Sequence, residues 1–159
     1  MKRLIFIISA LCLSLIVEAQ EYDVYKKGYK GTVAVGGLIG VTRGVGNNAF
    51  SLTTTHSYGY GNGLSVGAGV GLSAYMSGAV SVPVFTEMKY NILDCKICPF
   101  VDCRVGGEAM ISYKEYSPFF FVSPGFGVDC GRFNLRAAYL CEAGILKLHS
   151  FQITVGILL

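Results

Sequence analysis

Strict alternation between apolar and polar residues is the feature of this sequence that most restricts its fold. Between positions 64 and 74, every even-numbered residue is Leu, Val or Ala, and every odd-numbered residue is Gly or Ser. Successive side chains of a β-strand point to opposite faces, so this pattern predicts a strand with one apolar and one polar face. Segments 49–59, 80–92 and 147–158 alternate in the same way. We therefore expect the chain to be built from strands.

Eight segments of β-like composition follow one another from Lys30 to the last residue, separated by short intervals rich in turn-forming residues. They cover approximately residues 30–42, 49–59, 63–75, 80–92, 99–111, 118–129, 132–142 and 147–158. After the N-terminal region, no stretch approaches the roughly 18 uninterrupted apolar residues that indicate a membrane-spanning helix. The sequence thus predicts an all-β domain over residues 30–159, an eight-stranded antiparallel up-and-down barrel.

The composition indicates that this barrel crosses a membrane. Hydrophobic residues make up 52% of the chain and charged residues only 14%, whereas soluble domains average about 25% charged. The polar face of the strands carries mainly Gly, Ser and Thr, which suit a narrow interior, while a solvated face would carry long charged side chains. A closed barrel also satisfies every backbone polar group in lipid. The alternatives are a soluble sandwich and a soluble periplasmic barrel that binds an apolar ligand, which requires apolar residues inside and polar residues outside.

The first 19 residues have the pattern of a secretory signal peptide. Lys2 and Arg3 form a positive start, residues 4–17 are apolar, and the small residue Ala19 precedes Gln20. The apolar stretch is shorter than the roughly 20 residues that a spanning helix needs. We therefore expect residues 1–19 to be removed on export, residues 20–29 to form a short periplasmic segment, and the barrel to reside in the cell outer membrane.

Charged residues within the strands are predicted to form pairs in the barrel interior. In a hairpin between the fourth and fifth predicted strands, centred near Cys95, Glu87 faces Arg104. On the same face, Lys89 lies opposite Asp102. Opposite charges in a lumen too narrow for bulk water need to be paired in this way; a solvated hairpin edge is the alternative interpretation. Two further charged residues share this face: Glu108 and Arg136.

Outward aromatic residues gather toward the predicted strand ends. At the end that carries the chain termini they are Tyr58, Tyr90 and Phe133, and at the opposite end they are Phe50 and Phe120, with Tyr139 a little deeper. Two aromatic girdles at the membrane interfaces have this arrangement. Because aromatic residues also favour strands in general, the girdles only support the barrel prediction.

The cysteines that follow the signal peptide leave two interpretations open. The spacing of Cys95 and Cys98 is that of a redox pair or half a zinc site, but no second CxxC and no predicted helix follows, so neither is predicted. A local disulfide in a turn and free thiols both stay open. Cys103 and Cys141 fall on the outward face, where a thiol acts as a small hydrophobe. With Cys130 the count is odd, which argues against a disulfide framework.

No residue pattern predicts catalysis, a cofactor or a metal site. His56 and His149 both lie near strand ends, where they can be interfacial residues. The pair His149 and Ser150 invites comparison with membrane-embedded lipid hydrolases, but neighbouring strand residues point to opposite faces. The glycine-rich run 67–71 lies inside an alternating strand and opens no helix, so it is not a phosphate-binding loop. The net charge of +3, with scattered Lys and Arg, excludes a nucleic-acid-binding patch.

Five short motifs mark strand and turn positions: GAGVGL at 67–72, VPVF at 82–85, MKYN at 88–91, PFVD at 99–102 and FVSPGFGV at 121–128. With these motifs, nearly all of residues 30–159 resembles the outer-membrane β-barrel domain proteins of Gram-negative bacteria, which are similar in fold to the small OmpA-type and OmpX-type barrels. The resemblance implies a transmembrane barrel and carries over no functional residue. The chain ends Ile157-Leu158-Leu159, whereas such barrels often end in an aromatic residue that the insertion machinery recognises.

The predicted function is structural: an integral outer-membrane barrel with a role in membrane integrity, without enzyme activity. We expect no open pore, because side chains fill the interior of an eight-stranded barrel. The expected partners are outer-membrane lipid and the barrel-insertion machinery during biogenesis. We expect a monomer that binds no nucleic acid and no cofactor. The enzymatic alternative is lipid modification at the membrane interface by His149 and a nearby Ser.

Overall fold

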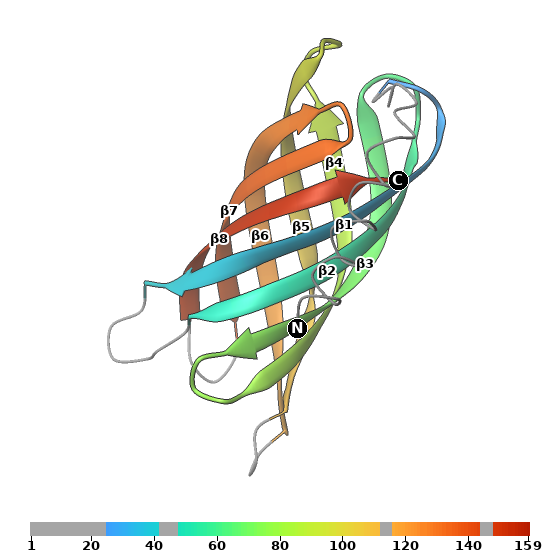
Figure 1. The fold of residues 1–159 in the computed structure, drawn as a ribbon. Helices are drawn as coiled ribbons and strands as arrows, with labels where there is room; N and C mark the ends of the chain where they lie inside the picture. Colours follow the sequence, from blue (N-terminus) through green and yellow to red (C-terminus); the bar gives the residue numbers. More distant parts are fainter. Residues whose placement is uncertain (1–24, 42–47, 112–115, 144–147) are drawn as a thin grey trace, which may run out of the picture.

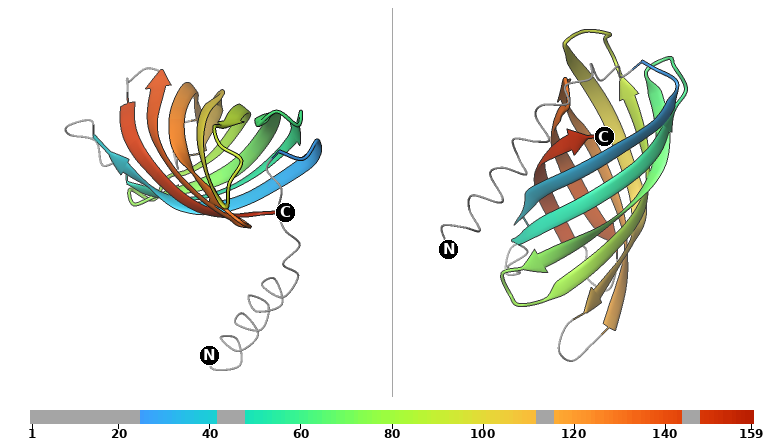
Figure 2. Two further views of the ribbon diagram at one scale, coloured as in Figure 1. Left: turned by 90° about the horizontal axis from the view of Figure 1, so that it is seen from above. Right: turned by 45° about the vertical axis from the view of Figure 1, so that its right-hand side comes forward.

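Eight antiparallel strands form a closed barrel in the computed structural model, which describes residues 25–41, 48–111, 116–143 and 148–159 (Figure 1). The strands are β1 (Gly28–Gly40), β2 (Ala49–Gly59), β3 (Leu64–Tyr75), β4 (Val80–Asn91), β5 (Ile97–Ile111), β6 (Tyr116–Cys130), β7 (Phe133–Ala143) and β8 (Leu148–Leu158). Each strand pairs with the next along the chain, and β8 pairs with β1. The strands are strongly inclined to the long axis of the barrel (Figure 2). The predicted fold is confirmed, and the predicted strand boundaries lie within about two residues of the observed ones.

The predicted signal peptide, residues 1–19, lies outside the described residues, as do residues 20–24 of the predicted N-terminal segment. In three places, residues 111, 116–119 and 148, the backbone alone is described. The described residues contain no helix that is long and apolar enough to cross a membrane.

Side chains alternate between the two faces of the barrel wall, as the sequence predicts. In β3, Gly69 and Ser73 are buried, while Val66, Val70 and Leu72 are exposed on the outside. The same alternation continues through the described side chains of β8. Large exposed apolar residues stand on the outward face of all eight strands. The alternative of a soluble barrel that binds an apolar ligand requires polar residues on the outside and apolar residues on the inside.

The barrel has two different ends. The terminal end, as we call it here, carries the C-terminal Leu159 and the short connections 60–63, 92–96 and 131–132. In the last of these, Gly131 has a φ of 57°, a left-handed conformation that suits glycine in a two-residue hairpin turn. Tyr25 covers part of this end, because its hydroxyl donates a hydrogen bond of 2.8 Å to the backbone oxygen of Asn91.

The loop end is the opposite end of the barrel. It carries the connections 41–48, 76–79, 112–115 and 144–147. Most of the first connection, and all of the third and fourth, lie outside the described residues. The second is a tight turn in which the amide of Gly78 donates a 2.9 Å hydrogen bond to the oxygen of Tyr75. The connection between β3 and β4 at this end is therefore short.

Two prolines interrupt the hydrogen-bond ladder of the barrel. Pairs are missing between β3 and β4 around Pro83, and between β6 and β7 around Pro124. Proline has no backbone N–H and cannot donate to the ladder. The register is the same on both sides of each gap. The prolines thus remove local pairing without shifting the strands, and the alternation of inward and outward residues continues past them.

Candidate functional site in the barrel interior

The interior of the barrel brings together the charged residues that the sequence singles out, so it is the candidate site. β4 and β5 pair in the predicted register, with Glu87 opposite Arg104 and Lys89 opposite Asp102. Glu87 and Arg104 are both buried, and the Arg104 Nε lies 2.6 Å from the Glu87 Oε2. The Arg104 guanidinium also lies 4.8 Å from the centre of the Phe85 ring. The first predicted pair is therefore present as a direct contact.

Arg136 of β7 is the centre of the interior hydrogen-bond network. Its side chain is 2% exposed, and its Nε donates to the Asp102 Oδ2 at 2.8 Å. One terminal nitrogen donates to the Gln152 Oε1 at 2.9 Å, and the other to the Ser123 backbone and hydroxyl oxygens at 3.1 and 3.2 Å. A bidentate guanidinium fork suits such a set of acceptors. One side chain thus ties β5, β6, β7 and β8 together.

The two acid–arginine pairs join into one row of alternating charge. The Asp102 Oδ2 lies 3.9 Å from the Arg104 Nε, so Glu87, Arg104, Asp102 and Arg136 follow one another along the inner face of the wall from β4 to β7. Two carboxylates and two guanidinium groups compensate each other in this row. Buried charges are tolerated when they are paired and hydrogen-bonded in this way. The row therefore places an electrostatically balanced set of charges inside the barrel.

Lys89 does not bind Asp102, and this part of the sequence prediction is wrong. Its Nζ instead lies 2.6 Å from the Asp129 Oδ2 and 4.0 Å from the centre of the Phe100 ring. The reason is that β6 and β7 follow β5 in the curved sheet, so their inward side chains reach over one strand to those of the hairpin. Arg136 is instead the residue that donates a hydrogen bond to the Asp102 carboxylate. The flexible lysine stem turns instead toward the terminal end, where Asp129 lies.

Asp129 anchors a second polar cluster at the terminal end. The side-chain amide of Asn91 donates to its Oδ2 at 2.8 Å, and that of Asn134 donates to its Oδ1 at 2.6 Å. With Lys89, the carboxylate has three donors, and it is 1% exposed. The sequence analysis did not single out Asp129 or Asn134. Both stand at inward positions of the alternation, which is the signal that could have placed them in the lumen.

Reversing Lys89 alone is expected to destabilise the barrel. Lys89→Glu puts a carboxylate beside Asp129 and removes one of its donors. We expect the free energy of unfolding to fall by about 2 kcal/mol, measured as a lower urea midpoint of the purified barrel. Lys96→Glu, at an exposed position of the β4–β5 turn, makes the same charge change and is expected to leave the midpoint unchanged. Equal midpoints for the two variants would contradict a lumenal ion pair.

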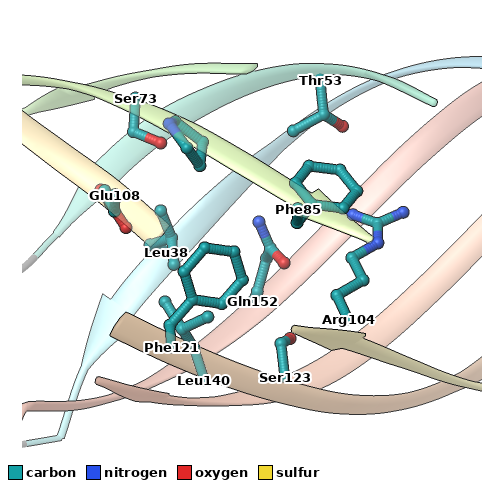
Figure 3. Close-up of a pocket in the computed structure, with 11 residues that line it drawn as sticks. Leu38, Thr53, Ser73, Phe85, Arg104, Glu108, Phe121, Ser123, Leu140 and Gln152 are labelled. Carbon is teal, nitrogen blue, oxygen red and sulfur yellow. The ribbon is translucent and has the colours of Figure 1, made fainter. Parts of the chain in front are cut away.

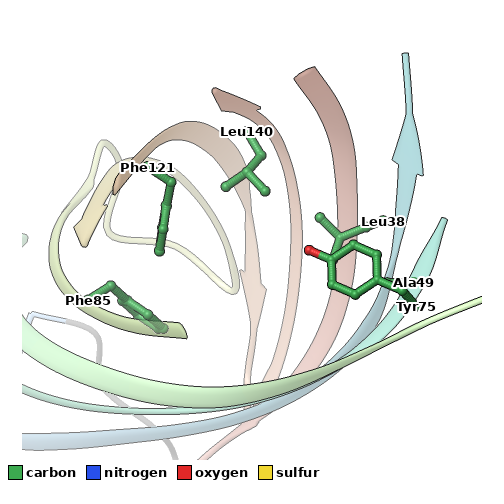
Figure 4. Close-up of a cluster of buried hydrophobic side chains, with 6 residues drawn as sticks. All are labelled: Leu38, Ala49, Tyr75, Phe85, Phe121 and Leu140. Carbon is green, nitrogen blue, oxygen red and sulfur yellow. The ribbon is translucent and has the colours of Figure 1, made fainter. Parts of the chain in front are cut away.

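The loop-end half of the interior contains an apolar cluster beside buried polar residues such as Ser73 and Glu108. Six buried side chains form a cluster there (Figure 4): Leu38, Ala49, Tyr75, Phe85, Phe121 and Leu140. The Phe85 and Phe121 rings lie 6.4 Å apart at 62°, an edge-to-face arrangement. The Tyr75 hydroxyl donates to the Glu108 Oε1 at 3.0 Å. The expectation of an interior lined mainly by Gly, Ser and Thr is therefore incomplete, because bulky residues take part in filling this half.

A small cavity lies between the charged row and the apolar cluster (Figure 3). The space open to the centre of a water molecule is about 30 Å³, which is room for roughly two water molecules. It is lined by Leu38, Thr53, Ser73, Pro83, Phe85, Arg104, Glu108, Phe121, Ser123, Leu140 and Gln152. Such a space does not accommodate a drug-sized ligand, which needs a pocket of about 300 Å³ or more.

The two histidines lie apart from the interior network. The His149 ring is outside the barrel, stacked on Tyr139 at 5.8 Å and 17°, while the adjacent Ser150 is 2% exposed and points inward. The opposite directions of His149 and Ser150 follow the parity argument from the sequence. His56 is also on the outside, where its Nδ1 lies 2.5 Å from the Tyr29 hydroxyl. The structure thus does not bring either histidine together with the charged row.

The described cysteines are free thiols in this structure. Cys103 and Cys141 face outward at intermediate exposure, as their position in the alternation predicts. Cys95 and Cys98 lie at the β4–β5 turn of the terminal end. Among the described residues, no three His, Cys, Asp or Glu side chains gather into a group that could hold a metal ion.

The fold is similar to several solved outer-membrane barrels. The N-terminal β-barrel domain of Pseudomonas aeruginosa OprF matches with a TM-score of 0.57 and 11% identity over 84% of this chain and 100% of that one. Neisserial surface protein A matches with a TM-score of 0.61 and 11% identity over 83% and 96%. The outer-membrane enzyme PagL matches with a TM-score of 0.58 and 14% identity over 80% and 98%.

These likenesses define the class of fold: the small eight-stranded outer-membrane β-barrel of OmpA and OmpX type. No protein-family model matches the chain, and a search of the curated proteins finds no match. At identities of 11 to 14%, the solved structures show a similarity of fold alone. The role of the chain has to be argued from its own residues.

Proposed function

We propose that this chain is an integral barrel of the outer membrane that contributes to membrane integrity, with no open pore and no enzyme activity. The observation that carries the proposal is the opposite chemistry of the two faces of its wall. Large apolar side chains cover the outside of all eight strands, while the paired charges lie inside. An outer surface of this kind suits lipid, because contact with water would expose far more contiguous apolar area than a soluble monomer carries.

Aromatic residues support the same orientation in a membrane. Tyr58, Tyr90 and Phe133 are exposed on the outside toward the terminal end, and Phe50 and Phe120 toward the loop end. Two such bands match the interfaces on either side of the hydrocarbon core. In this orientation the terminal end faces the periplasm, as in barrels with an even number of strands. Export by the predicted signal peptide fits this location. Outer-membrane lipid and the insertion machinery are then the partners of a monomeric barrel.

The interior supports a closed barrel. The charged row lies on the inner face of β4 to β7, and bulky apolar side chains occupy part of the loop-end half (Figure 4). The cavity described between them offers about 30 Å³ to water centres. An ion would have to break the pairs of Arg104 and Arg136 and pass the rings of Phe85 and Phe121. Both steps oppose conduction.

Planar bilayer recordings of the purified barrel test this proposal. We expect no discrete conductance steps from the wild-type chain at physiological salt. The double variant Phe85→Ala and Phe121→Ala removes the paired rings and is expected to admit water to the loop-end half, yet the charged row still blocks the path. A third change, Arg136→Ala, is expected to produce brief conductance steps. Regular open-channel steps from the wild-type barrel would overturn the proposal of a closed interior.

We propose no enzymatic role, since His149 points outward and its neighbour Ser150 points into the barrel. A lipid-modifying site at the membrane interface would need a nucleophile beside the imidazole. Membrane lipids from cells that express His149→Ala are expected to have the same mass profile as those from wild-type cells. A change in acyl-chain composition that appears only with the wild-type histidine would support the enzymatic alternative.

A further inference from the structure

We propose that Cys95 and Cys98 form a disulfide that closes the β4–β5 turn at the terminal end of the barrel. The inference rests on the proposed location, because it requires this end to face an oxidising compartment such as the periplasm. The two residues stand on either side of Lys96 and Ile97: Cys95 lies in the short connection 92–96, and Cys98 is the second residue of β5. The disulfide would thus join the turn to the first inward residue of β5.

The contacts of the two thiols place them within one tight turn. The Cys98 Sγ lies 3.3 Å from the backbone nitrogen of Cys95 and also contacts the backbone oxygen of that residue. The Cys95 Sγ points to the Ile97 oxygen at 2.8 Å. The sulfur of Cys98 is therefore already packed against the backbone of its partner. The disulfide requires the exposed Cys95 side chain to rotate away from the Ile97 oxygen toward the Cys98 sulfur.

The two thiols differ in access, which suits stepwise oxidation. Cys95 is exposed, whereas Cys98 is 4% exposed. A disulfide-bonded oxidant reacts first with the Cys95 thiolate, which forms a mixed disulfide and releases one thiol of the oxidant. The Cys98 thiolate then attacks the Cys95 sulfur and displaces the second thiol. Two protons and two electrons pass from the cysteines to the oxidant, which leaves as two thiols.

The other cysteines are placed where they do not compete. Cys130 pairs with Ile97 in the sheet and shares its outward direction, while Cys98 points inward opposite Asp129. Cys103 and Cys141 lie further along the wall on its outward face. Among these cysteines, Cys95 is thus the one that shares the turn with Cys98. The resulting bridge lies at the mouth of the lumen, next to the cluster of Asp129 and Lys89.

Peptide mapping tests the pair directly, because Lys96 separates the two cysteines. Trypsin cleaves after Lys89, Lys96 and Arg104, so the bridge holds peptides 90–96 and 97–104 together until reductant is added. Purified folded barrel without residues 1–19, oxidised with glutathione disulfide, is expected to give this linked pair and three free thiols, five minus two. The linked pair is expected to persist in Cys103→Ser and to vanish in Cys98→Ser.

Two results would overturn parts of the account separately. Five free thiols after oxidation of the folded barrel would overturn the disulfide itself. A linked pair after oxidation in solution, but five free thiols in barrel taken from cells under a thiol-blocking reagent, would support the pair and contradict the periplasmic location of the terminal end. A linked pair in both samples supports both.

Discussion

Arg136→Met is expected to lower the free energy of unfolding of the barrel by about 3 to 5 kcal/mol, the usual cost of breaking a buried ion pair from one side. Met fills most of the volume of the arginine but leaves Asp102 without its nearest cation. The substitution also removes the hydrogen bonds that Arg136 donates to Gln152 and Ser123. Together with the bond to Asp102, these link three other strands to β7. Urea unfolding of the purified barrel, followed by the fraction that keeps its folded gel mobility, measures the effect.

Arg132→Met is the matched control, because Arg132 lies at intermediate exposure in the β6–β7 turn. Its expected change is within about 0.5 kcal/mol, as for most surface substitutions. The double variant Arg136→Met with Asp102→Leu is expected to be more stable than Arg136→Met alone, since it removes the uncompensated carboxylate. An Arg136→Met barrel that unfolds at the wild-type urea concentration would show that the network does not hold the strands together.

Val70→Arg is expected to destabilise the barrel in lipid by about 2 to 4 kcal/mol, because it puts a charge on the outward face near the middle of β3. Val70 is 43% exposed and pairs with Thr54 and Val84 in the centre of the wall. In the proposed orientation this position faces the hydrocarbon core. The measurement is again the free energy of unfolding, here from vesicles.

Tyr90→Arg distinguishes the effect of depth in the membrane from the effect of side-chain exposure. Tyr90 is 45% exposed, almost the same as Val70, but it lies next to the terminal end of β4. A charge near the interface costs only about 0 to 1 kcal/mol. If the outward face met water instead of lipid, both substitutions would have small and similar effects. Equal costs for the two variants would therefore count against a membrane-spanning wall.

The fold was predictable because its signals are local. Alternation over 11 to 15 residues per strand fixes which face is inward, and short turns fix the register of each hairpin. The pairing of Glu87 with Arg104 follows from this register alone. A one-residue error in the β4–β5 turn would have turned every side chain of β5 to the other face, so the alternation left little choice.

The interior contacts between strands that do not pair with each other could not be predicted in the same way. Lys89 and Asp129 are separated by 40 positions and belong to strands that are not neighbours in the sheet. Their contact reaches over β5, which lies between the two strands, and depends on side-chain direction and the curvature of the wall, which no hairpin register specifies. Phe85 and Phe121 stand at inward positions of the alternation and both pair with Gly106 of β5, so their rings meet over a residue that has no side chain. Sequence reasoning found the wall of the barrel and only part of its filling.

The division of the interior has a physical consequence for the proposed role. The terminal half is held by directional hydrogen bonds that Arg136 donates and Asp129 accepts, and the loop-end half contains the apolar cluster around Phe85. Removing the donors of a buried carboxylate is costly, whereas an aromatic cluster tolerates small changes of shape. We therefore expect substitutions in the terminal half to affect folding most strongly.

Lipid contact at the outward face is the central claim, and single-tryptophan fluorescence tests it most directly. The natural chain has no Trp, so one introduced residue reports from one position. Val84 is 58% exposed on the outside of β4, and the next residue, Phe85, is 3% exposed on the inside. In vesicles of lipids with brominated acyl chains, Val84→Trp is expected to be strongly quenched and Phe85→Trp to keep its intensity. Equal quenching at both positions, or quenching of Phe85→Trp alone, would contradict a barrel that turns its apolar face to lipid.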